Sequence, residues 1–276
     1  MYSHLPPLNM GTLADGETRV FTSWRNCSVN DSNPAGNYYI WPSEALEFWS
    51  PHMRARNTNA DSLLAVAQAS NEYFYGWLSR GVDAFASYVK TRGGAHTSAS
   101  DVVNGLEVYL DYFQGPNFLP YANGNGNGTN NSGVGTTESV GMMQAVNEML
   151  LYAAPTATEP FLSPGHGMAE YVVELFPFWP TSEAAAFTSL LAKGGHLVSA
   201  TWDNVTRQVD DPVRIVAKYG DFGGERNRMS LYDPWASSTG ASVSVLCGGS
   251  KRAVTAFGAI VSFDTIVGED CLITKG

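Results

Sequence analysis

One carboxylate stands where it could act as a base in a reaction. Glu138 falls in the first turn of a helix that the sequence predicts over residues 137–152, and Met142 and Met149 follow it on the same face at helical spacing. The positive end of the helix dipole favours an ionised carboxylate, which suits a base or a group that supports a base. The alternative is that Glu138 only complements the helix dipole, the commoner role of a first-turn acid.

Aromatic residues and prolines gather in four clusters that could line a sugar-binding cleft. They lie at residues 37–44, 48–51, 176–180 and 232–235. Aromatic rings stack on the apolar faces of sugars, and neighbouring carboxylates and amides bind the hydroxyl groups. Core packing explains each cluster about as well, and it is the interpretation we favour from composition alone. Glu44, in the first cluster, could likewise be a first-turn acid of a short helix rather than an acceptor for a sugar hydroxyl.

Several other kinds of chemistry lack the residues they need. The 5 histidines lie far apart, and none has metal-ligand spacing with another His or a Cys, so no metal and no cofactor is expected. A Gly-x-Ser-x-Gly sequence is absent, which removes the usual motif of a serine hydrolase. The Gly/Asn-rich stretch 124–133 is followed by no lysine and preceded by no predicted strand, so it is a loop rather than a nucleotide site.

Charge and hydropathy narrow the range of partners. The 16 Lys and Arg residues form no long basic run in a chain with a net charge of −10, which argues against binding to nucleic acid phosphates. The longest apolar run, 253–263, is far shorter than the roughly 18 residues of a membrane-spanning helix. We therefore expect neither a nucleic acid nor a membrane partner.

Helical periodicity dominates the first part of the chain and strand periodicity the second. Helices are predicted over residues 61–78, 101–114 and 137–152, with shorter ones at 43–48 and 82–91. After Pro155 the period changes to two, and strands are predicted over 171–176, 189–192, 196–202, 205–209, 213–219 and 243–247. The predicted fold class is α+β, with a helical domain at 1–155 and an antiparallel β-sandwich at 156–276.

The cysteines and the glycosylation sequons leave the cellular compartment open. Cys247 and Cys271 could pair across the β-domain and leave Cys27 over, and three free buried thiols are the alternative. The first residues have neither the basic start nor the apolar stretch of a secretory signal. Secretion or an endomembrane location is expected if the full-length protein carries an upstream signal peptide. Asn-x-Ser/Thr sequons, which suit surface loops of secreted proteins, occur at Asn26, Asn30, Asn127, Asn130 and Asn204.

Three segments in a fixed order carry a resemblance to a known family. They are E-M-L-L at 148–151, L-F-P-F-W-P at 175–180, and the segment 187–200 with its central K-G-G. Over residues 136–202 the order and spacing resemble the C-terminal part of the six-hairpin glycosidases related to glycoside hydrolase family 95 α-L-fucosidases, and a looser match covers 37–44. The resemblance implies a partial (α/α) toroid of helical hairpins followed by a C-terminal β-sandwich. It also implies inverting hydrolysis of an α-L-fucosidic or related bond in an oligosaccharide or glycan.

The resemblance implies a role for individual residues. Glu138 becomes the candidate base or base support, although alignment of the helices places Thr137 at the position of the family's Asp. The segment 15–24, where the family's acid should stand in a Q-E-W sequence, does not match, and Glu17 is its nearest carboxylate. Substrate contacts are expected from the matching N-terminal element: Asn37, Tyr38, Trp41 and Glu44.

Length decides what activity we expect of the chain. Members of the family are considerably longer, with a β-domain and further helical hairpins ahead of the point that corresponds to residue 1. We therefore expect a partial enzyme that is inactive on its own. The alternative comes from another class: a non-catalytic carbohydrate-binding or structural fragment.

Overall fold

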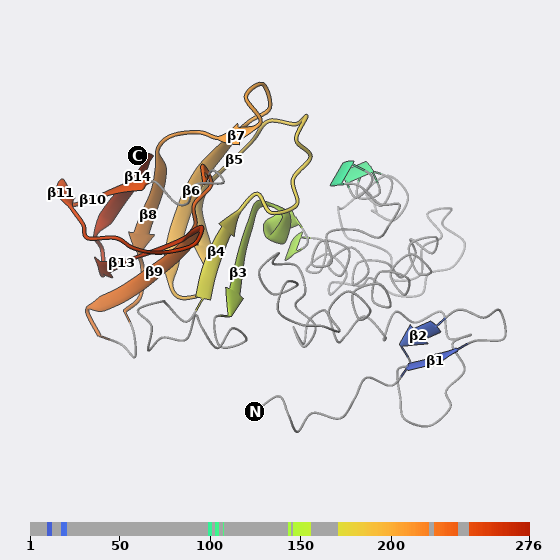
Figure 1. The fold of residues 1–276 in the computed structure, drawn as a ribbon, viewed down its shortest axis with the longest axis horizontal. Coiled ribbons are helices and arrows are strands. Elements are labelled where there is room, and N and C mark those ends of the chain that lie inside the picture. Colours follow the sequence, from blue (N-terminus) through green and yellow to red (C-terminus); the bar gives the residue numbers. More distant parts are fainter. Residues whose placement is uncertain are drawn as a thin grey trace, which may run out of the picture. The chain divides into compact units, whose positions relative to one another are not determined.

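The structure is a computed structural model that describes residues 10–12, 18–20, 99–100, 103–104, 107, 143–144, 146–155, 171–220, 224–236 and 243–276 (Figure 1). The chain divides into two compact units, Met1–Glu148 and Met149–Gly276. The boundary predicted between residues 155 and 156 falls after the strand β3 (Leu151–Pro155), whereas the division between the units falls before it.

The first unit is described at a few elements. Strands β1 (Met10–Thr12) and β2 (Thr18–Val20) form an antiparallel pair, in a part of the chain where the sequence predicts no strand. Helical residues at 103–104 and 107 lie in the helix predicted over 101–114, and those at 143–144 and 146–150 lie in the helix predicted over 137–152. The other predicted helices, and with them the partial toroid of helical hairpins, fall outside the described residues and stay predictions.

The second unit consists of two β-sheets (Figure 1). The five-stranded sheet has the order β12-β13-β9-β4-β3, with the bounds Thr255–Phe257, Ile260–Ile266, Arg226–Tyr232, Tyr171–Leu175 and Leu151–Pro155. The seven-stranded sheet has the order β11-β10-β14-β8-β6-β5, with the bounds Ser250–Lys251, Val243–Cys247, Asp270–Lys275, Val213–Ala217, His196–Asp203 and Ala185–Ala192, while β7 (Gln208–Val209) pairs with β6.

One strand pairing departs from the predicted antiparallel arrangement. β4 and β9 run parallel, with Val173 opposite Leu231, whereas the other described strand pairs are antiparallel. Between β4 and β9 the chain passes through the other sheet as β5 to β8. A long connection of this kind allows two neighbouring strands to point the same way.

The inner faces of both sheets contribute to one apolar core. In β8 the inward residues alternate with exposed ones: Val213, Ile215 and Ala217 are fully buried and Arg214 is exposed. This period of two places one side chain in every pair on the core side of the sheet. A single cluster joins the two sheets, and its fully buried members include Val198, Val213, Ile215, Val245, Ile273 and Leu231.

Two elements differ from the prediction for identifiable reasons. The helix predicted to run to residue 152 ends at Leu150, because Leu151 to Pro155 pair with β4 as β3. The strand predicted over 205–209 exists only as Gln208–Val209. Residues 204–207 form a turn instead, since the carboxylate of Asp203 accepts the backbone N–H of Val205 at 2.8 Å.

The predicted strands at 171–176, 213–219 and 243–247 and the hairpin around Gly194 and Gly195 are confirmed as β4, β8, β10 and the β5–β6 pair, with shifts of a few residues at their ends. The hairpin turn depends on glycine. Gly195 has a φ of +83°, and a Cβ there would lie 3.1 Å from Cβ of Tyr219 and 3.3 Å from its carbonyl oxygen.

We predict that Gly195→Ala destabilises the protein by about 1–3 kcal/mol more than Gly249→Ala does. Both glycines have a positive φ, but a Cβ at Gly249 would meet nothing within 4 Å. Gly249→Ala therefore measures the cost of the positive φ for alanine without a steric clash. The measurement is urea-induced unfolding followed by tryptophan fluorescence. Equal losses in the two variants would contradict a steric role for Gly195.

Candidate functional site

The residues that the sequence singles out for catalysis and substrate contact lie in the first unit. Glu138, Asn37, Tyr38, Trp41 and Glu44 are outside the described residues, and so is Glu17. Their roles therefore stay predictions. The described residues of the second unit include two of the aromatic clusters, His196 and two of the cysteines, and the structure shows their contacts.

The aromatic cluster at 176–180 packs against the sandwich. The ring of Phe176 lies 5.3 Å from that of Phe187 and 5.8 Å from that of Trp202, measured between centroids. The indole N–H of Trp179 donates to the carbonyl oxygen of Glu183 at 2.9 Å. Phe176 follows the end of β4, whereas Phe187 and Trp202 belong to β5 and β6 of the other sheet. The cluster is thus a corner that joins the two sheets.

The aromatic cluster at 232–235 is also engaged in structure. Trp235 packs on the core and donates its indole N–H to the carbonyl oxygen of Val209 at 2.7 Å. Asp233 is buried and accepts the backbone N–H of Trp235 at 2.8 Å. For these two clusters the packing interpretation is confirmed. The clusters at 37–44 and 48–51 lie outside the described residues.

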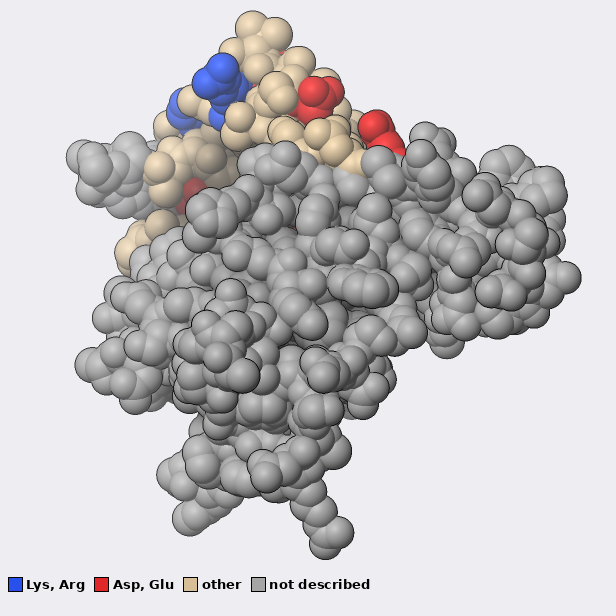
Figure 2. All heavy atoms as spheres, turned by 90° about the vertical axis from the view of Figure 1, so that its right-hand side faces the viewer, with Lys and Arg blue, Asp and Glu red and all other residues tan. Residues whose placement is uncertain are grey.

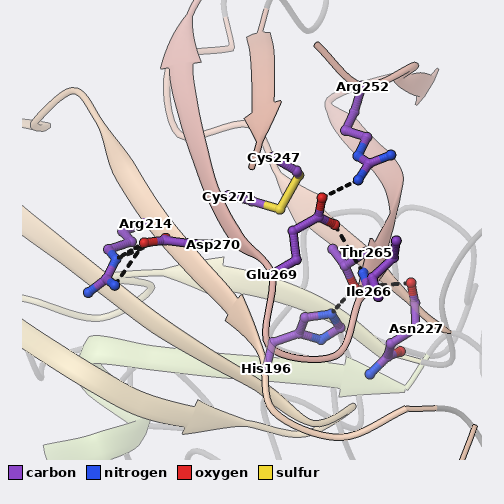
Figure 3. Close-up of a disulfide and its surroundings, with 10 residues drawn as sticks. All are labelled: His196, Arg214, Asn227, Cys247, Arg252, Thr265, Ile266, Glu269, Asp270 and Cys271. Carbon is purple, nitrogen blue, oxygen red and sulfur yellow. Dashed lines mark hydrogen bonds and ion pairs between the residues drawn. A yellow bond between two sulfur atoms is a disulfide. The ribbon is translucent and has the colours of Figure 1, made fainter. Parts of the chain in front are cut away.

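Three buried polar residues form a cluster between the two sheets: His196, Asn227 and Thr265 (Figure 3). Nε2 of His196, on β6, lies 3.2 Å from the hydroxyl of Thr265, on β13 of the other sheet. The hydroxyl of Thr265 donates to the backbone carbonyl oxygen of Asn227 at 3.1 Å. The side-chain nitrogen of Asn227, Nδ2, donates to the backbone carbonyl oxygens of Gly194 and Tyr219, at 2.6 Å in each case.

The environment of His196 decides its protonation. Burial lowers the pKa of His196 from 6.5 to about 4, and a hydrogen bond to the backbone of Gly194 offsets part of this effect. The imidazole is therefore neutral near pH 7. Because the side chain is only 1% exposed, neither ring nitrogen can reach a substrate. His196 joins the sheets and has no access for acid or base chemistry.

Cys247 and Cys271 form a disulfide between β10 and β14 (Figure 3). The two residues are direct partners in the strand register, their Cα atoms lie 4.0 Å apart, and both are buried. Next to them, the carboxylate of Glu269 pairs with Arg252 and accepts the backbone N–H of Ile266 at 3.1 Å. Of the two arrangements that the sequence left open, the structure contains the paired one.

The same residues raise the question of a metal site. The ligand atoms of Cys247, Cys271 and Glu269 lie within 4.8 Å of one another. A zinc ion would need cysteine thiolates, which the disulfide removes, and a free carboxylate, which Arg252 already binds. In this oxidised state the cluster does not fit a metal ion.

Some of the charged side chains described in the second unit form ion pairs between neighbouring strands. Arg214 binds both carboxylate oxygens of Asp270 between β8 and β14, and Arg228 pairs with Asp264 between β9 and β13. The side chains of these pairs are largely exposed, so water screens the attraction and each pair contributes little to stability. On the face in Figure 2, the described basic and acidic side chains stand in separate small groups among neutral ones.

Within the part of the chain that the structure describes, no helix combines the length and the apolar content needed to cross a bilayer.

Comparison with known proteins gives little support for any family. No protein-family model and no curated protein sequence matches the chain. Among solved structures, the catalytic domain of GH30 xylanase C from Talaromyces cellulolyticus aligns with 15% identity and a TM-score of 0.23. The alignment covers 34% of this chain and 20% of the xylanase chain. A likeness of this extent carries no argument about fold or function, and no comparison points to the family 95 fucosidases.

We predict that loss of the disulfide, in the double variant Cys247→Ala with Cys271→Ala, lowers the free energy of unfolding by about 3 kcal/mol. The bond closes a loop with a sequence separation of 24, and loss of the crosslink raises the entropy of the unfolded chain. Thiol titration of the denatured wild type should detect Cys27 alone, since the other two of the 3 cysteines are paired. The control Cys27→Ser should detect none, and three thiols in the unreduced wild type would refute the pairing.

We predict that His196 makes stability depend on pH. The pKa in the folded state, about 4, lies below the ordinary value of 6.5, so the unfolded chain binds a proton that the folded protein rejects. Stability is then fully present above pH 6.5 and falls by roughly 3 kcal/mol as the pH drops to about 4. Urea unfolding at several pH values measures this slope. It should flatten in His196→Gln, and an unchanged slope would assign it to another group.

Proposed function

We propose that the protein is a glycoside hydrolase of the inverting, α-L-fucosidase-like kind, or a part of one. In this proposal the chemistry belongs to the first unit, and the β-sandwich of the second unit is its structural companion. The bond hydrolysed is an α-L-fucosidic or related bond in an oligosaccharide or glycan.

The observation that carries the proposal is the corner at residues 175–180. The L-F-P-F-W-P segment and the strand pair that follows it are the residues on which the family resemblance rests. In the structure this segment contacts the strand pair directly, because Phe176 packs on Phe187 and Trp202. The indole N–H of Trp179 also donates to the carbonyl oxygen of Glu183, just before β5. A segment that fixes the junction of two sheets has a physical reason to keep its sequence pattern. This supports a relationship in fold more strongly than it supports a particular substrate.

The proposed mechanism needs two groups on opposite sides of the bond. Inversion requires an acid for the leaving oxygen and a base for the attacking water, with carboxyl groups roughly 6.5–9.5 Å apart. We assign the base, or the support of the base, to Glu138 at the start of its predicted helix. We assign substrate contacts to the following residues: Asn37, Tyr38, Trp41 and Glu44. The acid is not assigned, because the segment 15–24 does not match the family's sequence.

A second candidate function follows from a specific observation on the second unit. Trp179, Trp235 and Phe176 are committed to hydrogen bonds or ring contacts. The described arginine–carboxylate pairs leave those carboxylates engaged as well. These facts favour a structural role for the sandwich and are compatible with a chain that is a non-catalytic carbohydrate-binding or structural fragment.

We expect no turnover from an incomplete enzyme; if the chain does release the aryl group from an aryl α-L-fucoside, we predict that Glu138→Gln lowers kcat/KM by at least about a hundredfold because the base loses its charge. Glu225→Gln is the matched control, since Glu225 is an exposed carboxylate of the second unit. The measurement is initial-rate release of the aryl group over a range of substrate concentrations.

The outcomes separate the two candidates. Turnover that survives Glu138→Gln would remove Glu138 from the mechanism. Absence of turnover on any aryl glycoside, by a chain that unfolds cooperatively, would favour the non-catalytic fragment.

A further inference from the structure

The turn between β6 and β7 presents a glycosylation sequon at the surface. Asn204, Val205 and Thr206 form this Asn-x-Thr sequence, and all three are exposed, with Val205 at 86%. An enzyme that modifies the asparagine can therefore approach the whole sequon in the folded unit. The sequons at the other positions lie outside the described residues.

The turn is held together by a residue outside the sequon. Oδ1 of Asp203 accepts the backbone N–H of Val205 at 2.8 Å, and Oδ2 accepts the hydroxyl group of Thr206 at 2.9 Å. These donors hold the pKa of Asp203 below its usual value, so the carboxylate stays charged at neutral pH. Because the turn does not depend on the Asn204 side chain for these bonds, a substituent on Asn204 leaves them intact.

The Asn204 amide has a proton to spare. Its Nδ2 donates one hydrogen bond, at 3.0 Å, to the carbonyl oxygen of Ser182. A carboxamide nitrogen carries two protons, so one remains for substitution after the other has bonded to Ser182. The bond anchors the side chain beside the start of β5, and the tip of the turn stays open to solvent.

The disulfide independently indicates the compartment in which such a substitution occurs. Formation of the Cys247–Cys271 bond oxidises two thiols and passes two electrons and two protons to a disulfide oxidant, which is reduced to a dithiol. Stable disulfides of this kind form in secretory compartments and are rare in the cytosol. Attachment of N-linked glycans to Asn-x-Ser/Thr belongs to the same secretory route.

We propose that Asn204 is an acceptor for an N-linked oligosaccharide, attached in the compartment in which the Cys247–Cys271 disulfide forms. The donor class is a polyisoprenyl diphosphate-linked oligosaccharide. Nδ2 of Asn204 forms a bond to the anomeric carbon of the sugar, the bond from that carbon to the diphosphate oxygen breaks, and the lipid diphosphate leaves. The amide proton passes to a base of the transferring enzyme. This proposal does not depend on the glycosidase assignment.

The position gives the glycan a physical consequence. β5 is the last strand of the seven-stranded sheet, and most of its residues are exposed or half-buried. A strand at a sheet edge can pair with another chain unless bulk or charge blocks it. An oligosaccharide on Asn204, beside the segment that leads into β5, adds polar bulk at this edge.

The test is translation of the full chain behind a cleavable secretory signal in the presence of microsomes. In the starting variant the other sequons are removed by substitution of glutamine at Asn26, Asn30, Asn127 and Asn130. We expect one mobility shift that peptide N-glycosidase reverses. Thr206→Ser keeps the sequon and should keep the shift, whereas Thr206→Ala and Asn204→Gln should lose it.

A second measurement assigns the site directly. Trypsin releases the peptide 194–207, which follows Lys193, ends at Arg207 and contains Asn204 as its single asparagine. Enzymatic deglycosylation in heavy-oxygen water should convert Asn204 to labelled aspartate. A chain that enters the microsomes and remains unmodified at Asn204 would overturn the proposal, as would a shift that persists in Asn204→Gln.

Discussion

The second unit depends on the burial of one face of each β-sheet against the other. Strands of the seven-stranded sheet contribute Val198, Ile215 and Ile273 to this core, and strands of the five-stranded sheet contribute Leu231 and Phe263. Neither sheet could keep this apolar face in water, so the two sheets stabilise each other. The polar cluster of His196, Asn227 and Thr265 adds buried hydrogen bonds that connect the two sheets.

Among the described residues of the second unit, several groups that could do chemistry are engaged in structure. His196 is neutral and inaccessible, the cysteines are oxidised to a disulfide, and the arginine–carboxylate pairs engage one another across strands. The residues that carry the family resemblance at 175–180 form a structural corner. The glycosidase mechanism that we propose draws on the first unit, where Glu138 is assigned from sequence.

Alternation along the sequence predicts some of the strands whose two faces differ, although β14, which also alternates, was missed. In β8 and β10 apolar residues alternate with polar ones, because one face is buried and the other is exposed. β9 and β13 were missed because most of their residues are buried on both faces, Ser230 and Ser262 among them, so no alternation appears. The start of β3 was assigned to a helix, since a short apolar run fits either period until its partner β4 is known.

The sequence offers contacts between distant residues only as alternatives, as it does for Cys247 and Cys271. The pairing of Cys247 with Cys271 follows from the register of β10 and β14, which spacing along the chain does not define. The polar cluster likewise brings His196 and Thr265 together from different sheets. For His196, one feature of the sequence indicates burial: its place at an inward position of the predicted strand 196–202. For the candidate site, the helix start beside Glu138 lies outside the described residues and stays a prediction, and the sequence does not identify the acid.

Native-state hydrogen exchange tests the shared core most directly. If the two sheets stabilise each other, the amides of β8 and β9, central strands of the two sheets, should exchange only through unfolding of the whole unit. The account predicts that both strands show the same free energy of opening, equal to the free energy of unfolding measured with denaturant. Exchange of one sheet at a distinctly lower free energy, while the other stays protected, would contradict it.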